Sequence, residues 1–140
     1  MQIPGIDYDE TFSPITHFES LQLLLVLAAL EDWHIHQMDI KLAFLNDVLD
    51  EEIYMEQPQG FIVAGMENKV CKLKKSIYGL KQASCTWNLQ FHGLLLELGF
   101  KQMSSDTGVY VMHQSQGEDS LSLLIIILYV DDITIMGHGS

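Results

Sequence analysis

Arginine is absent from the chain, and its seven lysines are opposed by 19 acidic residues, so the formal net charge is −12. A protein that binds nucleic acid unaided normally presents a basic face, because neutralising phosphates drives its affinity. The composition therefore argues against a self-sufficient nucleic-acid binder. Five of the lysines nevertheless lie within thirteen residues and form either a local basic strip or a solvated face: Lys69, Lys72, Lys74, Lys75 and Lys81.

Cysteine and long apolar runs are scarce as well. Cys71 and Cys85 form no Cys-x-x-Cys motif, so we expect two reduced cysteines in an intracellular protein and no disulfide framework. The apolar stretches 23–30 and 121–130 are shorter than the roughly 20 residues that cross a bilayer. The residues after Met1 lack the basic start and apolar run of a signal peptide, which predicts that the protein is neither secreted nor membrane-bound.

With 140 residues, of which 48% are apolar, the chain is large enough to bury a core and corresponds to one domain or a piece of one. Residues 16–19 have the Ser/Thr-x-x-Glu form of a capping box and predict a helix over 19–32 that is apolar nearly all round. Apolar side chains at helical spacing predict a second helix over 82–98, with Gly99 at its C-terminal cap.

Short β-compatible runs occur between and after these helices. We predict strands at 34–40, 53–55, 70–73, 109–112, 123–130 and 133–136, a brief helical turn within 41–49, and a linker at 114–120. This mixture lacks the regular alternation of a doubly wound fold. It favours an α+β fold with helices on one face of a mostly antiparallel sheet.

Two adjacent acids, Asp131 and Asp132, interrupt the last apolar region of the chain. Carboxylates at the rim of a core cost free energy unless something compensates them, and a divalent cation would do so. The alternative is a hairpin turn, where aspartate is common. Asp39 ends another β-compatible run, and if the two strands are neighbours the three carboxylates make an oxygen-rich site suited to Mg²⁺. The spacing alone leaves open whether they are.

A pair of such ions about 3.5–4 Å apart is the arrangement that catalyses phosphoryl transfer in polymerases and nucleases. A zinc site is the other metal hypothesis, because His34 and His36 point the same way along a strand. No third nitrogen or sulfur ligand stands at a suitable spacing, which disfavours zinc.

Five blocks of the sequence resemble, in the same order, successive blocks of copia-type reverse transcriptases. They are residues 5–14 (GIDYDETFSP), 37–46 (QMDIKLAFLN), 52–61 (EIYMEQPQGF), 70–83 (VCKLKKSIYGLKQA) and 129–132 (YVDD). Together they cover essentially the whole chain, and their joint occurrence favours the metal-binding interpretation of the acids over the turn.

The resemblance implies that residues 1–140 are the palm of a right-hand polymerase with part of its fingers. The implied activity is RNA-directed DNA polymerisation, in which a dNTP is joined to a primer 3′-OH on an RNA template. Asp39, Asp131 and Asp132 would be the catalytic acids and the ligands of two Mg²⁺ ions, with Mn²⁺ as an alternative.

The resemblance also assigns a nucleotide pocket. Phe44 would crowd the sugar 2′ position and so select deoxynucleotides, Gln82 and Lys41 would line the pocket, and Tyr129 would lie near the primer end. The implied partners are the RNA template, the DNA primer and the dNTP. The implied location is a cytoplasmic particle or the nucleus, and the oligomeric state stays open.

By the same resemblance, a basic fingers segment belongs before Met1, and a thumb and ribonuclease H domain belong after Ser140. We therefore expect a truncated fragment that does not polymerise alone. Leu42, the Ser84-Cys85 pair and His17 replace residues that are usual in the family, namely threonine, Pro-Arg and a cation. These departures support the alternative of a catalytically inert remnant, or of a non-enzymatic interaction module.

Overall fold

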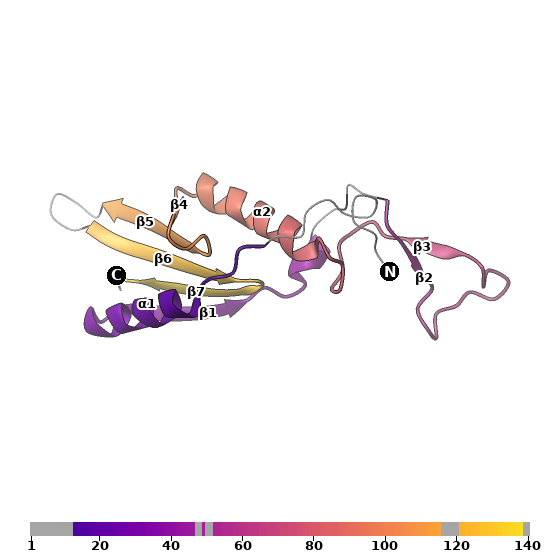
Figure 1. The fold of residues 1–140 in the computed structure, drawn as a ribbon, viewed down its shortest axis with the longest axis horizontal. Coiled ribbons are helices and arrows are strands. Elements are labelled where there is room, and N and C mark those ends of the chain that lie inside the picture. Colours follow the sequence, from indigo (N-terminus) through magenta and orange to yellow (C-terminus); the bar gives the residue numbers. More distant parts are fainter. Residues whose placement is uncertain (1–12, 47–48, 50–51, 116–120, 139–140) are drawn as a thin grey trace. The chain divides into compact units, whose positions relative to one another are not determined.

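The computed structural model describes residues 13–46, 49, 52–115 and 121–138. Among these the chain divides into two compact units, which we call the small unit (42–87) and the sheet unit (13–41 and 88–138). The elements, in chain order, are α1 (Phe18–Leu30), β1 (His34–Asp39), a 3₁₀ helix (Ala43–Asn46), β2 (Tyr54–Glu56), β3 (Val70–Lys72), α2 (Ala83–Glu97), β4 (Lys101–Gln102), β5 (Val109–Ser115), β6 (Leu121–Tyr129) and β7 (Asp132–Gly137) (Figure 1).

The sheet unit is built on a five-stranded sheet in the order β1-β7-β6-β5-β4, and every neighbouring pair in it is antiparallel. In the small unit β2 and β3 form a separate antiparallel pair. The predicted α+β class with an antiparallel sheet is confirmed. No helix among the described residues has the length and apolarity needed to span a membrane.

The two helices lie on opposite faces of this sheet, so the expectation that they share one face is wrong. Ala28 of α1 packs in a buried cluster with Ile125 and Ile127. Tyr110 points to the other face, because side chains alternate along a strand, and its hydroxyl lies 3.0 Å from Nδ1 of His92 in α2. Residues 125–128 of β6 are all buried, as expected for a strand covered on both faces.

The N-terminus of α1 is not held by the predicted capping box. The helix begins at Phe18, and its N-cap residue, His17, makes no side-chain cap hydrogen bond. The hydroxyl of Thr16 donates instead to the carbonyl of Leu128, at 2.8 Å. The capping-box prediction was wrong because the hydroxyl of Thr16 donates to a distant carbonyl outside the helix.

The remaining element predictions hold to within a few residues, apart from two differences. Strand β4 was not predicted, since two residues are too few to show a period. The predicted linker begins inside β5, which includes residues 114 and 115, and the rest of it lies outside the described residues. Gly99, with φ of 92°, closes α2 as expected, and the N–H of Phe100 donates to the carbonyl of Leu95.

Candidate active site

The acids at the end of the sheet come together through strand pairing. In the antiparallel register of β1 and β7, Asp39 lies opposite Asp132. The N–H of Ile40 donates to the carbonyl of Asp131 at 3.1 Å, which extends this pairing by one step. The sequence left open whether these two strands are neighbours, and the structure pairs them. The pairing brings acids from distant parts of the chain to one sheet end.

The register also decides which side chains share a face. Tyr129 pairs with Asp132 across β6 and β7, just as Asp39 does across β1 and β7. Directly opposed residues in antiparallel strands point to the same side of the sheet. Tyr129, Asp132 and Asp39 therefore form one row on the face that α1 covers farther along, and all three are exposed.

The tip of the β6–β7 hairpin contains backbone strain. Only Val130 and Asp131 separate the paired residues Tyr129 and Asp132, and Val130 has φ of 58°. In two-residue turns with a positive φ at the first central position, that position usually belongs to glycine. A β-branched residue is a rare occupant of this region, and such outliers concentrate at functional sites.

A cavity of about 390 Å³ adjoins the row of side chains. Asp132 is the charged residue among those that line it, and the others are Thr16, Phe18, Leu21, Gln37, Ile127, Tyr129 and Thr134. The cavity thus lies between the start of α1 and the sheet end, with a carboxylate on its wall.

No three His, Cys, Asp or Glu side chains cluster tightly enough to hold a metal ion within the described part of the chain. The zinc hypothesis for His34 and His36 thus gains no third ligand. The opposed carboxylates of Asp39 and Asp132 are a different donor set. Mg²⁺ is commonly bound by one or two carboxylates together with water and substrate phosphates, so this pair fits a magnesium ion that a phosphate substrate completes.

Two of the predicted nucleotide-pocket residues belong to the small unit, and not to the unit of the acids. Phe44 is buried in the 3₁₀ helix, where its ring meets that of Tyr78 edge-on with centroids 4.5 Å apart. Gln82 is buried directly before α2, and its carbonyl accepts hydrogen bonds from the N–H and hydroxyl of Thr86. Lys41 is exposed and follows β1 at the end of the sheet unit.

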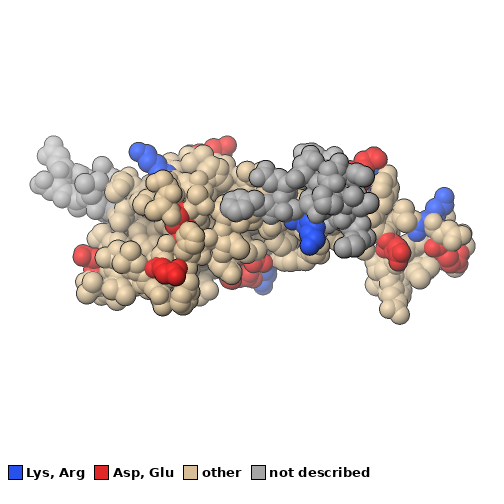
Figure 2. Space-filling model, in the orientation of Figure 1, with Lys and Arg blue, Asp and Glu red and all other residues tan. Residues whose placement is uncertain are grey.

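The basic strip is also in the small unit. Lys72 is paired with Glu52, and the hydrogen bond from Lys72 holds the pKa of Glu52 below its ordinary value. Lys69, Lys74 and Lys75 are exposed. On the face seen in Figure 2, the described lysines stand apart among acidic and uncharged side chains.

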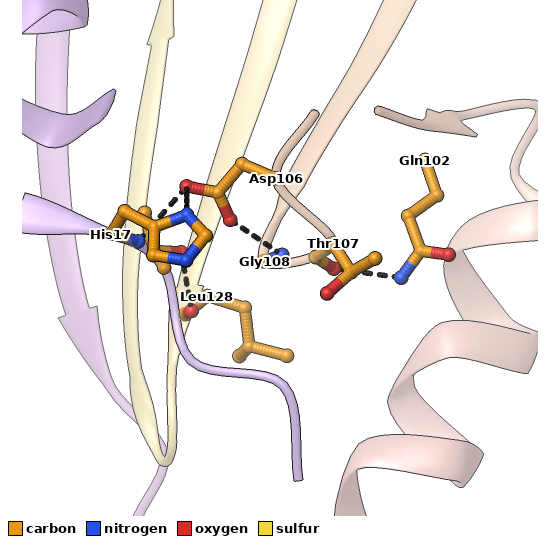
Figure 3. A network of polar contacts seen from close by, with 7 residues as sticks. His17, Gln102, Asp106, Thr107, Gly108 and Leu128 are labelled. Atoms are coloured by element: carbon orange, nitrogen blue, oxygen red, sulfur yellow. Dashed lines mark hydrogen bonds and ion pairs between the residues drawn. The ribbon is translucent and has the colours of Figure 1, made fainter. Parts of the chain in front are cut away.

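One acid that the sequence analysis did not single out is Asp106, which precedes β5 and is only 4% exposed. Its carboxylate accepts hydrogen bonds from the N–H groups of His17 and Gly108, at 2.9 and 3.0 Å (Figure 3). Burial alone would raise the pKa of Asp106, but hydrogen bonds from Ser20, His17 and Gly108 outweigh it and lower the pKa. The Asp-x-Gly spacing of an Asx-turn was the available signal.

Comparison with known proteins places the chain in a family. All of residues 1–140 match the model of the reverse transcriptase (RNA-dependent DNA polymerase) family, to which the chain therefore belongs. It resembles the Pol polyproteins of copia-type retrotransposons, as the sequence blocks predicted.

Among its relatives is the retrovirus-related Pol polyprotein from transposon TNT 1-94 of Nicotiana tabacum, 46% identical over 97% of this chain and 10% of that protein. The Pol polyprotein from transposon RE1 of Arabidopsis thaliana is 42% identical over 98% of this chain and 9% of its own length. The transposon Ty1-BL Gag-Pol polyprotein of Saccharomyces cerevisiae is 32% identical over 91% and 7%. The chain thus spans a tenth or less of these relatives, and no solved structure matches it.

Proposed function

We propose that this chain forms the carboxylate-bearing core of an RNA-directed DNA polymerase, which joins dNTPs to a DNA primer on an RNA template. The observation that carries the proposal is the register of β1 and β7, with Asp39 opposite Asp132. Like charges directly opposed across antiparallel strands destabilise a sheet. An exposed pair of this kind at a strand end is therefore better explained by a bound cation than by folding.

Asp39, Asp131 and Asp132 do not by themselves form a tight three-ligand cluster. In this proposal they would hold two Mg²⁺ ions, for which Mn²⁺ can substitute, once substrate phosphates complete the ligand set. When bound, the ions activate the attacking primer hydroxyl and neutralise charge on the leaving pyrophosphate. Tyr129, in the same row of side chains as Asp132, orients the primer end. The strained residue Val130 directly precedes Asp131 and Asp132, as expected where backbone strain is retained at a functional site.

We further propose that the sheet unit is the palm and that the small unit is part of the fingers. Phe44 and Gln82, both buried within the small unit, and Lys41, exposed in the sheet unit, are each proposed as contacts of the dNTP. The edge-on contact with Tyr78 would fix the orientation of the Phe44 ring, and in this proposal that ring excludes a ribose 2′-hydroxyl.

We expect the chain by itself to show no activity in primer extension. Its net charge of −12 opposes binding of a polyanion, and one of the five clustered lysines is already neutralised by Glu52. The relatives of which this chain spans about a tenth are whole Pol polyproteins, and we propose that activity depends on basic surfaces of the kind that such a longer protein can supply.

Metal binding by the chain tests the proposal without requiring polymerase activity. Mg²⁺ should raise the unfolding midpoint of the wild type, and Asp39→Asn and Asp132→Asn should each abolish this rise. Glu97→Gln is the matched control, because Glu97 is an exposed acid at the end of α2. An equal Mg²⁺ response in all four proteins would contradict the proposed site.

Primer extension by a Pol polyprotein that contains this chain tests the activity itself. Asp132→Asn should lower extension at least about 100-fold, whereas Glu97→Gln should leave it unchanged. A polyprotein that folds, binds Mg²⁺ through these acids and still extends no primer would instead support the inert-remnant alternative.

A further inference from the structure

We call the β6–β7 turn that carries Asp131 and Asp132 the acidic hairpin. Shortly before this turn, Leu128 of β6 lies beyond the paired part of β5 and is held by the side chain of Thr16. Strand β5 begins at Val109, which pairs with Ile127. One residue farther along β6, the N–H of Leu128 donates to the carbonyl of Gly108 at 2.8 Å. The carbonyl of Leu128 then accepts the hydroxyl of Thr16, also at 2.8 Å. Thr16 thus completes the edge of β6 directly before Tyr129.

Thr16 can reach this carbonyl only because Gly108 has no side chain. A Cβ atom at position 108 would lie 2.1 Å from Oγ1 and 2.7 Å from the backbone nitrogen of Thr16. Backbone atoms cannot move aside as a flexible side-chain end can. The segment before α1 and the turn before β5 are therefore in direct van der Waals contact.

A single carboxylate fixes both of these segments. Oδ2 of Asp106 accepts the N–H of His17, the residue after Thr16, and Oδ1 accepts the N–H of Gly108. The imidazole Nδ1 of His17 lies 3.3 Å from the same Oδ2 atom. Figure 3 shows Asp106 between His17 and Gly108, with Leu128 beside them. Two anchored backbone groups leave Thr16 little freedom to move away from Leu128.

We propose that Asp106 is a positioning residue for the acidic hairpin: by tying His17 to Gly108 it holds Thr16 on the carbonyl of Leu128. The hairpin that follows is thereby kept in register with Asp39. The inference deepens the proposed function and rests on it, since it assigns Asp106 and Thr16 to the support of that site. Neither residue contacts the reacting atoms in this proposal.

The reporter for the test is the N–H of Ile40, because it donates to the carbonyl of Asp131 and so measures docking of the hairpin on β1. Amide hydrogen exchange of the ¹⁵N-labelled chain is measured by NMR for the wild type and for variants. Thr16→Val removes the hydroxyl while keeping the shape, and Asp106→Asn removes one acceptor. We expect exchange of the Ile40 amide to accelerate about tenfold in each variant, relative to amides in the middle of β6.

Two further variants serve as rescue and control. Thr16→Ser keeps the hydroxyl and should restore slow exchange at Ile40. Gln102→Leu removes hydrogen bonds from Gln102 to the Thr107 carbonyl and the Tyr110 hydroxyl, in the same turn region but away from Leu128. It should leave Ile40 exchange unchanged relative to β6.

Unchanged Ile40 exchange in Thr16→Val would overturn the inference. So would an acceleration spread evenly over all amides of the sheet, because that is the signature of a merely structural loss of stability. If Asp106→Asn does not fold, the Thr16→Val and Thr16→Ser pair decides alone. The exchange measurement is made without Mg²⁺, and metal binding is tested separately by adding Mg²⁺ to the same proteins. A failure of metal binding then contradicts the proposed function and not the positioning role.

Discussion

Asp39 and Asp132 are opposed across two antiparallel strands, at a sheet end where both side chains are exposed. In the absence of Mg²⁺ their charges repel. We therefore expect Asp39→Asn to raise the free energy of unfolding in metal-free buffer by roughly a few tenths of a kcal/mol. Urea unfolding with and without EDTA measures this, with Glu97→Gln as the control. A metal-free loss of stability in Asp39→Asn would show that the pair is not repulsive.

The hairpin tip gives a second prediction. Val130 has a positive φ, which costs a β-branched residue about 1–2 kcal/mol, whereas glycine adopts it freely. Since glycine also loses more chain entropy on folding, we expect Val130→Gly to stabilise the chain by about 0.5–1 kcal/mol. Thermal unfolding is the measurement. Val130→Ala retains the unfavourable φ and should not reproduce the gain.

Two glycines should respond to the same substitution with opposite signs. A Cβ at Gly108 would collide with the backbone of Thr16, so Gly108→Ala should destabilise the chain by about 2 kcal/mol or more. At Gly93, inside α2, a Cβ would meet nothing within 4 Å, and Gly93→Ala should stabilise by about 0.5–1 kcal/mol. Urea midpoints of the two variants check this, and equal effects would refute the close packing at position 108.

The lowered pKa of Asp106 predicts how stability depends on pH. A carboxyl group whose pKa is lower in the folded chain contributes stability that is fully present above the ordinary aspartate pKa of about 3.9. That contribution is lost as the pH falls through the lower folded value. We expect the wild type to lose stability more steeply than Asp106→Asn below about pH 4. Urea unfolding from pH 6 downwards measures both slopes, and parallel curves would contradict the assignment.

Hydrophobic runs and their lengths were enough to predict most of the strands and both helices. The run before Asp131 and Asp132 and the run before Asp39 each became a strand near the expected bounds. What no run could reveal was the register, because pairing between segments so far apart depends on the whole sheet. The three acids could therefore be singled out, but not shown to meet.

Short-range patterns failed where a distant group competed with them. Thr16 fits a capping box, yet its hydroxyl donates to the carbonyl of Leu128, which lies beyond the paired part of β5. Asp106 was not singled out, because its donor His17 is 89 positions away in the chain. The sequence also did not reveal which helix covers which face of the sheet. The four buried residues of β6 show that both faces are covered, but not by which helix.

In the strand order β1-β7-β6, the two opposed acids lie on strands with different numbers of hydrogen-bonded neighbours. Asp132 begins β7, which pairs with β1 and β6, whereas Asp39 lies on β1, an edge strand that pairs only with β7 in the part of the chain that the structure describes. Border strands fray at lower free energy than interior ones. Transient dissociation of β1 from β7 would thus separate the two carboxylates while the β6–β7 hairpin stays folded. The lifetime of the opposed acid pair is therefore set by the stability of β1 pairing.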